Sequence, residues 1–357
     1  MKSKAMVLIE PGRLEMQDFE LTEPGTDQVL IKVGTTSVCA SDPKIFKGES
    51  PFTYYPIIMG HEFAGTVVEI GSKASAMYGL KPGERVTVEP TIPCGHCEWC
   101  KTSHNYHKCR PLRAYGVTMQ ADNPPYLLGG YAEYMYLLPG SLIYKVDDKV
   151  SDRAASLSSV IGNGVRWVKT LANMSADKSL VISGTGSQGL ATLIAAREYG
   201  VGPIVILGLS KDTARFKLAK EFEAEYIINV ERDDPLEAVP DLLGGFPDAV
   251  VETSGVPSAI QTAIELVKMK GCVVSIGISG GKKTSIQFDK LVAKGVTIIC
   301  DHAQAGNYPD AMRILNSRKF AIEKINNFTY SLEDLPKALK ATADPPEEFI
   351  KGAVVFD

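Results

Sequence analysis

The sequence predicts an α/β protein in which a doubly wound parallel sheet is joined to a second domain of irregular β-structure. The 357 residues exceed what one hydrophobic core usually organises. Residues from about 160 to 300 alternate short apolar runs with helical patterns, as in a parallel sheet covered by helices. The first 155 residues or so show short alternating runs broken by glycine and proline, which predict an irregular β-barrel.

The parallel-sheet domain opens with a glycine-rich turn typical of dinucleotide binding. An apolar run at 180–182 leads into Gly184-x-Gly186-x2-Gly189, and an alanine-rich helical pattern follows. These glycines allow a tight turn and close approach of the backbone to a pyrophosphate, and the helix N-terminus supplies the positive end of a dipole. Further buried strands are predicted at 203–208, 248–255 and 271–277.

Four of the seven cysteines lie in one hydrophilic stretch, with the spacing Cys94-x2-Cys97-x2-Cys100-x8-Cys109. Two successive Cys-x2-Cys steps let neighbouring thiolates converge on one ion, and a fourth thiolate closes a tetrahedron. A site with four sulfur ligands has no open position, so it stabilises a loop and does not catalyse. Free thiols or a redox pair are the alternatives to a structural zinc.

Other cysteines and histidines have simpler predicted roles. His96, His104 and His107 lie within the cysteine-rich stretch, and we expect them to be solvated loop residues because four sulfurs saturate the ion. Cys272 and Cys300 fall in predicted apolar strands, where we expect them to pack in the core.

Composition excludes several classes of function. The chain has 38 basic and 42 acidic residues, a net charge of -4, and no long basic run, so nucleic acid is not an expected partner. No apolar stretch is long enough to span a bilayer, and the N-terminal one is too short for a signal peptide, so no membrane role is expected. We predict a cytoplasmic protein, and a reducing compartment favours metal binding over disulfides.

Two more motifs stand upstream of the cysteine-rich stretch: "CASDPK" at 39–44 and "GHEFAGTVVEIG" at 60–71. With the cysteines and the glycine turn in this order, the whole chain resembles the zinc-containing medium-chain dehydrogenase/reductases, the alcohol and sorbitol dehydrogenase superfamily.

The resemblance implies a domain division. A GroES-like β-barrel catalytic domain would cover 1–159 and 301–357, with the structural zinc lobe at about 94–109. A Rossmann domain that binds NAD(H) or NADP(H) would cover 160–300.

The resemblance also implies roles for the residues around the first motif. Cys39 and His61 match the catalytic zinc ligands, and thiolate plus imidazole suits zinc. Ser41 matches the hydroxyl that passes on the substrate proton, and Asp42 matches a carboxylate that orients His61. Lys44 stands where relatives often have the histidine that ends this relay, although an exposed loop lysine is an equal alternative.

The third zinc ligand departs from the family pattern. Relatives place a cysteine or glutamate five residues before a glycine, and here Ser159 precedes Gly164 by five. A neutral hydroxyl is a poor zinc ligand. Glu62 can replace it, since some relatives bind the metal through this glutamate. The site then holds zinc through Cys39, His61 and Glu62 with an open fourth position, or it binds zinc weakly or not at all; both outcomes stay open.

The choice of dinucleotide depends on the end of the second strand. NAD-specific domains have an acidic residue there, whereas this sequence has Gly208. Asp212, reaching the ribose from a longer loop, is the alternative, but the missing acid slightly favours NADP(H). Basic and hydroxyl side chains for a 2′-phosphate are Ser210, Lys211 and Arg215. Lys351 matches a basic residue that meets the cofactor pyrophosphate in relatives.

The resemblance implies a NAD(P)-dependent oxidoreductase. We expect zinc-assisted hydride transfer between nicotinamide and a small secondary alcohol or polyol and its ketone. A zinc-independent reductase of a conjugated enone or enal, and a catalytically silent nucleotide-binding redox sensor, are the alternatives. The last parallel strand leaves a free edge, which relatives pair across a two-fold axis, so a homodimer or homotetramer is expected.

Overall fold

The computed structural model describes residues 1–101 and 105–356. The chain forms two compact units, Met1–Ser159 with Leu315–Asp357, and Val160–Ile314. The chain returns to the first unit at Leu315, later than the expected Asp301. The reason is that Asp301 pairs with Arg166 over 2.6 Å inside the second unit.

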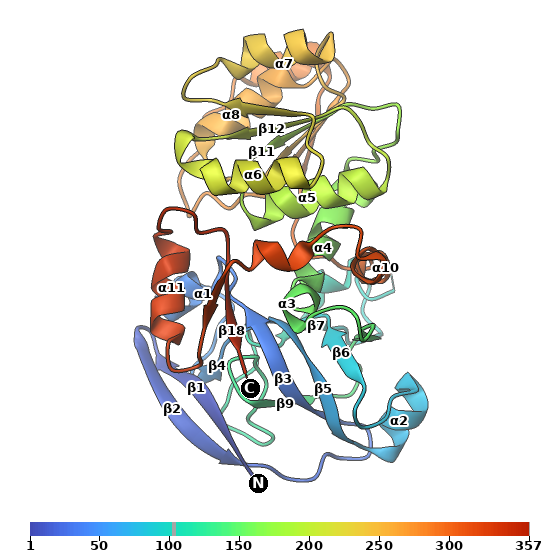
Figure 1. The fold of residues 1–357 in the computed structure, drawn as a ribbon, viewed down its shortest axis with the longest axis vertical. Coiled ribbons are helices and arrows are strands. Elements are labelled where there is room, and N and C mark those ends of the chain that lie inside the picture. Colours follow the sequence, from blue (N-terminus) through green and yellow to red (C-terminus); the bar gives the residue numbers. More distant parts are fainter. Residues whose placement is uncertain (102–104, 357) are drawn as a thin grey trace. The chain divides into compact units, whose positions relative to one another are not determined.

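The first unit is built around a mixed sheet (Figure 1). Buried apolar side chains of its strands form the unit's core, and in β3 and β5 they include consecutive residues. The hydrogen-bonded order is β10 (Ile143–Lys145), β6 (Arg85–Val88), β5 (Glu62–Ile70), β3 (Val29–Ser37), β18 (Gly352–Val355) and β17 (Phe328–Tyr330), and β9 (Tyr134–Leu137) also pairs with β3.

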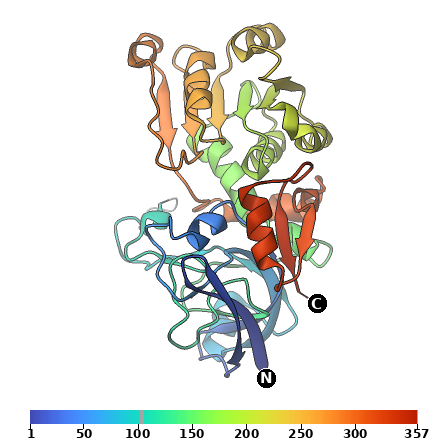
Figure 2. The same cartoon turned by 90° about the vertical axis from the view of Figure 1, so that its left-hand side faces the viewer.

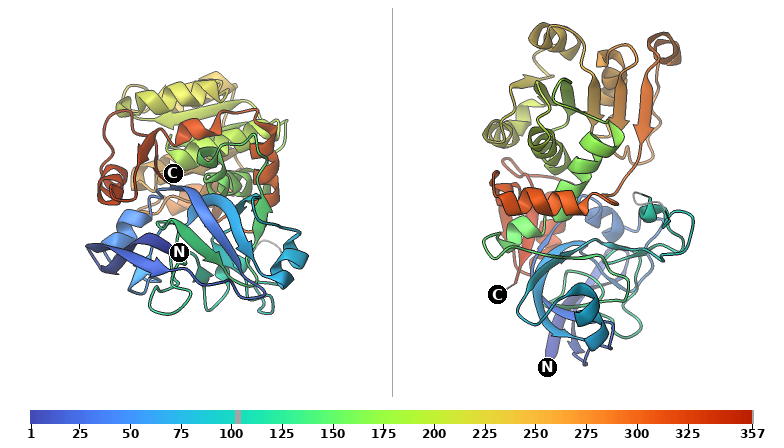
Figure 3. Two further views of the ribbon diagram at one scale, coloured as in Figure 1. Left: turned by 60° about the horizontal axis from the view of Figure 1, so that its bottom comes forward. Right: turned by 90° about the vertical axis from the view of Figure 1, so that its right-hand side faces the viewer.

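Smaller elements complete this unit, and its strands curve around the core in the right-hand view of Figure 3. A second sheet has the order β2 (Arg13–Glu20), β1 (Lys2–Glu10) and β4 (Ile57–Ile58), and β7 (Thr91–Ile92) pairs with β8 (Arg113–Ala114). The helices are α1 (Asp42–Phe46), α2 (Ser72–Tyr78), α3 (Asp152–Ala155) and α11 (Leu335–Ala343), while α4 (Ser158–Val165) runs from this unit into the next.

The C-terminal segment is part of the first unit's sheet. Strand β18 runs antiparallel to β3, with Ala353 opposite Ser37, and α11 packs against it (Figure 2). The N–H of Val38 donates to the carbonyl oxygen of Gly352 over 2.8 Å. This pairing places Lys351 beside the residues that follow β3.

The second unit is a parallel six-stranded sheet with the order β13 (Tyr226–Asn229), β12 (Ile204–Gly208), β11 (Leu180–Ser183), β14 (Ala249–Glu252), β15 (Cys272–Ser275) and β16 (Thr297–Cys300). Its helices are α5 (Ser187–Glu198), α6 (Thr213–Glu221), α7 (Pro235–Leu243), α8 (Pro257–Leu266), α9 (Phe288–Lys294) and α10 (Tyr308–Ser317). The direction of strand addition reverses at β11, so ligands are expected at the carboxyl ends of β11 and β14.

The position of β16 at the edge of this sheet contradicts the prediction that Cys300 packs in the core. Cys272 is half-buried on β15, but Cys300 is exposed, because it ends β16 at the edge of the sheet. An apolar run at an edge strand lacks neighbours on one side, so Cys300 is not a core residue. Among the described residues, no helix has both the length and the apolar character needed to cross a lipid bilayer.

Candidate metal and cofactor sites

The antiparallel pairing of β3 and β5 brings Cys39, His61 and Glu62 together. Ser37, the last residue of β3, lies opposite Glu62, the first residue of β5. Cys39 therefore follows the end of one strand where His61 precedes the start of its neighbour. The ligand atoms of Cys39, His61 and Glu62 all lie within 4.8 Å of one another. One zinc ion, with bonds of about 2.0–2.3 Å, spans such a set after small side-chain shifts.

Asp42 contacts two of these residues. Its Oδ2 accepts the backbone N–H of Cys39 over 2.8 Å and the hydroxyl of Tyr131 over 2.7 Å. Its Oδ1 lies 3.4 Å from Nδ1 of His61. Asp42 and Tyr131 are fully buried. Burial lowers the pKa of His61, but the negative charges of Asp42 and Cys39 outweigh it, so the pKa lies well above its usual value.

A strip of backbone supports the segment before His61. Tyr131 N–H donates to Met59 O over 3.0 Å, and Gly130 N–H donates to Gly60 O over 2.7 Å. A Cβ atom on Gly129 would lie only 1.9 Å from Ile58 O, so glycine is required for this close approach. Residues 129–131 therefore bind the backbone just before His61, and the hydroxyl of Tyr131 binds Asp42. Sequence analysis missed Tyr131, because no local spacing links it to the motif.

Ser41 lies on the other side of the imidazole. Its Oγ is 3.4 Å from Nε2 of His61. Since Nδ1 faces Asp42, Nε2 is the ring nitrogen that remains for a metal. Lys44 lies in the last turn of α1 and is partly exposed. Ser41 thus sits at the ligand group as the resemblance implied, and Lys44 is one helical turn away along the chain.

Lys351 is buried against the same group. Its Nζ lies 2.8 Å from Oε2 of Glu62 and donates to Val38 O over 2.9 Å. Both side chains are at most 5% exposed. Burial lowers the pKa of Lys351, but the charge of Glu62 outweighs it and raises the pKa above its usual value. The structure therefore places Lys351 on the carboxylate of Glu62, a contact that sequence analysis did not predict.

The buried charges of this group fit a divalent cation. In the deprotonated state that a metal requires, with Cys39 as a thiolate and His61 neutral, Cys39, Asp42 and Glu62 carry three negative charges and Lys351 one positive charge, a sum of -2. Uncompensated buried charge is costly, and a divalent cation would neutralise it. Ser159 is buried in α4 and carries no charge to offer. The residues present thus fit a zinc ion on Cys39, His61 and Glu62.

The four clustered cysteines form a second set. Their sulfur atoms all lie within 4.8 Å of one another, and Cys94 Sγ is 3.8 Å from Cys100 Sγ. Backbone N–H groups of His96 and Cys97 lower the pKa of Cys94 to about 6, which favours the thiolate that a metal needs. Burial instead raises the pKa of Cys109 to about 12. Four sulfurs at this spacing fit one structural zinc.

The histidines of this lobe differ from expectation. His96 is exposed as expected, but His107 is only 2% exposed, so it is not a solvated loop residue. The short helix at Tyr106–Lys108 turns His107 inward. His104 lies outside the described residues.

A buried carboxyl group joins this lobe to the barrel. Glu89 is fully buried. Its Oε2 accepts a hydrogen bond from the hydroxyl of Tyr106 over 2.5 Å, and its Oε1 accepts one from the hydroxyl of Tyr144 over 2.9 Å. Burial raises the pKa of Glu89 to about 7, against the lowering effect of the two tyrosines. Sequence analysis did not single out Glu89, since an acidic residue between two apolar strands gives no motif.

In the second unit, the glycine turn lies between β11 and α5. Gly184 has a φ of +106°, and a Cβ atom on Gly189 would lie 2.0 Å from Gly184 O. Both positions therefore need glycine, one for the turn and one for helix–strand packing. Gly186 is the N-cap of α5, and a Cβ there would meet no atom within 4 Å. The turn thus leaves open space at the helix N-terminus, where a pyrophosphate fits.

The end of β12 lacks both an acid and the room for one. A Cβ on Gly208 would lie 2.6 Å from the ring of Phe216. Asp212 is buried, accepts the N–H of Leu209 over 2.9 Å, and lies 2.7 Å from Arg215. Asp212 and Arg215 therefore bind each other and cap their own turn.

The remaining predicted residues of this loop are exposed. Lys211 is exposed, and the backbone N–H of Ser210 donates to Glu231 over 2.7 Å. Ser210 Oγ accepts from Asn229 over 2.9 Å. Lys211 is thus the exposed basic residue among those predicted in this loop, and it lies near the carboxylate of Glu231.

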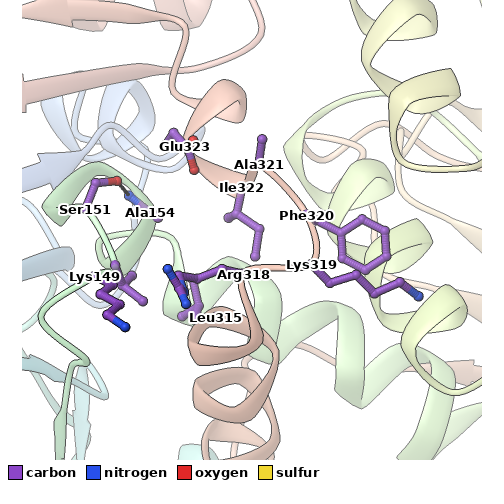
Figure 4. A pocket seen from close by; sticks show the side chains of 11 residues that line it. Lys149, Ser151, Ala154, Leu315, Arg318, Lys319, Phe320, Ala321, Ile322 and Glu323 are labelled. Atoms are coloured by element: carbon purple, nitrogen blue, oxygen red, sulfur yellow. Dashed lines mark hydrogen bonds between the residues drawn. The ribbon is translucent and has the colours of Figure 1, made fainter.

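A separate cavity of about 320 Å³ lies in the first unit at the end of α10 (Figure 4). Apolar side chains such as Leu315 and Ile322 line it, and Lys149 and Arg318 lie on one side of it with Glu323 on another. It shares no residue with the group of proposed metal ligands Cys39, His61 and Glu62. Its lining offers no set of metal ligands.

Comparisons with known proteins agree with these sites. Residues 25–148 match the family model for the alcohol dehydrogenase GroES-like domain, and residues 189–317 match that for zinc-binding dehydrogenases. A sorbitol dehydrogenase of Halalkalibacterium halodurans is 31% identical over 92% of each chain. A protein of Mycobacterium tuberculosis named probable alcohol dehydrogenase is 34% identical over 78% of this chain and 76% of its own.

A solved structure covers the whole chain. It is a protein of Sinorhizobium meliloti 1021, described as a zinc-binding dehydrogenase and bound to NADP. It is 25% identical, covers 100% of both chains and has a TM-score of 0.89.

The fold and the paired sites define an NAD(P)-dependent dehydrogenase with a GroES-like domain and a Rossmann domain. The chain belongs to the zinc-containing medium-chain dehydrogenase/reductase superfamily, with the alcohol and sorbitol dehydrogenases. The predicted fold class and enzyme class are thereby confirmed.

Proposed function

We infer that this enzyme transfers a hydride between the nicotinamide of NAD(P) and a small secondary alcohol or polyol, or the corresponding ketone. One observation carries the inference: the ligand atoms of Cys39, His61 and Glu62 all lie within 4.8 Å of one another. The sorbitol dehydrogenase among the relatives supports a secondary alcohol as substrate.

Cys39, His61 and Glu62 would hold a catalytic zinc, with Glu62 supplying the charge that Ser159 lacks. When bound, zinc polarises a carbonyl oxygen or lowers the pKa of an alcohol. Asp42 keeps the proton of His61 on Nδ1, so that Nε2 is free as a ligand. Lys351 pairs with one of the two oxygens of Glu62, which leaves the other oxygen for the metal.

Proton transfer falls to residues beside this group. Ser41, 3.4 Å from Nε2 of His61, would accept the proton of the substrate hydroxyl and pass it outward. Lys44, which is partly exposed in the last turn of α1, would be the next acceptor. Cys94, Cys97, Cys100 and Cys109 would hold the structural zinc, which takes no part in the reaction.

The dinucleotide is proposed to be NADP(H) in preference to NAD(H). Gly208 has no room for the acidic side chain that would bind the ribose hydroxyls. Lys211, and Ser210 beside it, would bind the 2′-phosphate, while Gly184, Gly186 and Gly189 would accommodate the pyrophosphate. The NADP found in the Sinorhizobium meliloti relative supports this choice. A ratio of kcat/KM values for the two dinucleotides tests it.

A homodimer or homotetramer is proposed from the edge of the sheet. Strand β16 is the last strand, and apolar side chains lie exposed on it and on α9: Ile298, Phe288 and Val292. Pairing two β16 strands across a two-fold axis would cover the edge. Sedimentation at micromolar concentration distinguishes this from a monomer.

Zinc content and turnover together test the proposed reaction. We expect two zinc ions per subunit, and NADPH oxidation with ketones that stops when a chelator removes one zinc. One zinc per subunit, with full activity on enones or enals in chelator, would instead establish the metal-free reductase. Bound dinucleotide without turnover of either substrate class would indicate the redox sensor.

A further inference from the structure

Two segments of the first unit carry large exposed side chains, one between α1 and β4 and one directly after Cys109. Phe52 is 50% exposed and Tyr54 is 61% exposed, in the segment 47–56 between α1 and β4. Arg110, also exposed, directly follows the buried ligand Cys109. Large apolar side chains that stay exposed beside a reaction site are candidates for substrate contact.

Arg110 and Phe52 contact each other. The guanidinium carbon of Arg110 lies 5.8 Å from the centroid of the Phe52 ring. One terminal nitrogen donates to Cys109 O over 2.8 Å. Within the described part of the chain, Arg110 has no carboxylate partner. A guanidinium group has five N–H donors, so the stacked Arg110 is oriented and most of its donors remain available.

The segment that carries Phe52 is fixed beside the metal-ligand group. The hydroxyl of Tyr55 donates to Ile45 O over 3.0 Å, on the helix that begins directly after Ser41. The side-chain amide of Gln120 donates to the carbonyl oxygen of Tyr55 over 2.8 Å. Strand β4 follows this segment and leads along the chain to His61. Phe52 is three residues from Tyr55, so their Cα atoms lie within about 11 Å. The segment that carries Phe52 is thus tied to helix α1, which begins directly after Ser41, and it continues through β4 to His61.

The two segments that carry this pair have an excess of basic residues, although the chain as a whole is negative. The segments 43–56 and 105–115 contain five basic residues and one acidic residue: Lys44, Lys47, Lys108, Arg110 and Arg113 against Glu49. The whole chain has 38 basic and 42 acidic residues. A local excess of positive charge attracts anions, and planar arginine binds phosphate and carboxylate through paired hydrogen bonds.

We propose that Arg110, stacked on Phe52, binds an anionic group of the substrate, so that the physiological substrate is a secondary alcohol bearing a phosphate or carboxylate. The proposal rests on the proposed hydride transfer for the reacting hydroxyl. It adds the class of substrate, which the metal ligands do not specify. The ring of Phe52 contacts the guanidinium group of Arg110, and the N–H groups of Arg110 donate hydrogen bonds to the anionic group of the substrate.

Binding measurements test the subsite without requiring turnover. Calorimetry in the presence of saturating NADP would compare sorbitol, sorbitol 6-phosphate and gluconate, which separates phosphate from carboxylate recognition. In the wild type we expect at least one anionic compound to bind ten- to a hundredfold more tightly than sorbitol. Arg110→Met should remove that preference, and Phe52→Leu should weaken it.

Lys108→Met is the matched control. Lys108 lies two residues away, and its Nζ is 5.9 Å from the ring of Trp99, so it is also a cation over an aromatic ring. The preference should survive in this variant. Equal binding of neutral and anionic compounds by the wild type, or equal losses in both variants, would overturn the assignment to Arg110. A preference that depends on Arg110 in an enzyme without hydride transfer would support the subsite and contradict the proposed function.

Discussion

The hydroxyl of Tyr131 donates a 2.7 Å hydrogen bond to Asp42 Oδ2, the same oxygen that accepts the backbone N–H of Cys39 over 2.8 Å. The second oxygen of Asp42 lies 3.4 Å from His61 Nδ1. One buried carboxylate therefore orients two of the three proposed ligands, and Tyr131 orients the carboxylate. Partners of this kind affect metal affinity although they never touch the ion.

Tyr131→Phe should weaken retention of the catalytic zinc. The substitution removes one hydroxyl and leaves the ring in place, so Asp42 loses a donor and gains freedom to rotate. We expect zinc to dissociate from this site about ten- to a hundredfold faster. Zinc transfer to a chromogenic chelator measures the rate, and the visible spectrum of the cobalt-substituted protein reports the ligand geometry.

Tyr136→Phe provides the control for a lost buried hydroxyl. Tyr136 is 2% exposed, and its hydroxyl binds the backbone of Thr22 at 2.9 and 2.7 Å. This variant should lose stability to a similar extent, about 1 kcal/mol, and keep the zinc release rate. If both variants release zinc equally fast, Tyr131 acts only through the stability of the fold.

Glu62→Gln should remove the catalytic zinc and keep the structural one. An amide is a much weaker zinc ligand than a carboxylate, and the change leaves the buried charge of Lys351 without its partner. Metal analysis should fall from two zinc ions per subunit to one, with loss of turnover. Unchanged metal content and unchanged turnover would show that Glu62 is not a ligand.

Ser159→Cys is the complementary change. A thiolate at the family's usual third-ligand position should tighten zinc binding if α4 presents residue 159 to Cys39 and His61. In the double variant with Glu62→Gln, a return to two zinc ions per subunit would establish that a cysteine at residue 159 can serve as the third zinc ligand. Failure to restore zinc would mean that the site depends on Glu62 alone for its third ligand.

Sequence motifs predict the parts of the candidate sites that are local in the chain. The glycine turn and the four cysteines each lie within one short segment, so their spacing alone predicts the chemistry. Tyr131 and Lys351 escaped prediction because strand pairing brings them to Asp42 and Glu62 from distant segments. Long-range pairing of this kind leaves no periodic signal in one sequence.

Exposure was also hard to predict from local pattern. Cys300 lies in an apolar run, but its strand is the last in the sheet, and strand order is a property of the whole fold. His107 lies in a polar segment, but a short helix turns it inward. In both cases the tertiary neighbours, not the local composition, decide burial.

Cys97→Ser should remove zinc from the cysteine lobe. Structural zinc stabilises the folded state by mass action, by about 3–4 kcal/mol when zinc exceeds its Kd by 100- to 1000-fold. We expect the free energy of unfolding to fall by that amount and metal content to fall by one zinc. Cys272→Ser, at a half-buried cysteine outside the cluster, should keep both zinc ions. Unchanged zinc in Cys97→Ser would refute the four-cysteine site.

Glu89 should make stability depend on pH. Burial raises its pKa from the ordinary 4.5 to about 7. Between these values the unfolded chain has lost the proton while the folded protein keeps it, so the unfolded state binds fewer protons. The free energy of unfolding therefore falls as pH rises from about 4.5 to 7, by up to about 3 kcal/mol, and the contribution is constant above that range.

Glu89→Gln should flatten this part of the pH dependence, because an amide does not titrate. Urea unfolding of both proteins at pH 5 and pH 7.5, in the same excess of zinc, isolates the effect, since the zinc contribution is common to both. The wild type should lose about 2.4 kcal/mol more than the variant between the two pH values. Tyr144→Phe removes a hydroxyl that lowers the pKa of Glu89, so it should move the transition to higher pH. Parallel pH profiles for wild type and Glu89→Gln, with no shift in Tyr144→Phe, would mean that Glu89 does not titrate in this range.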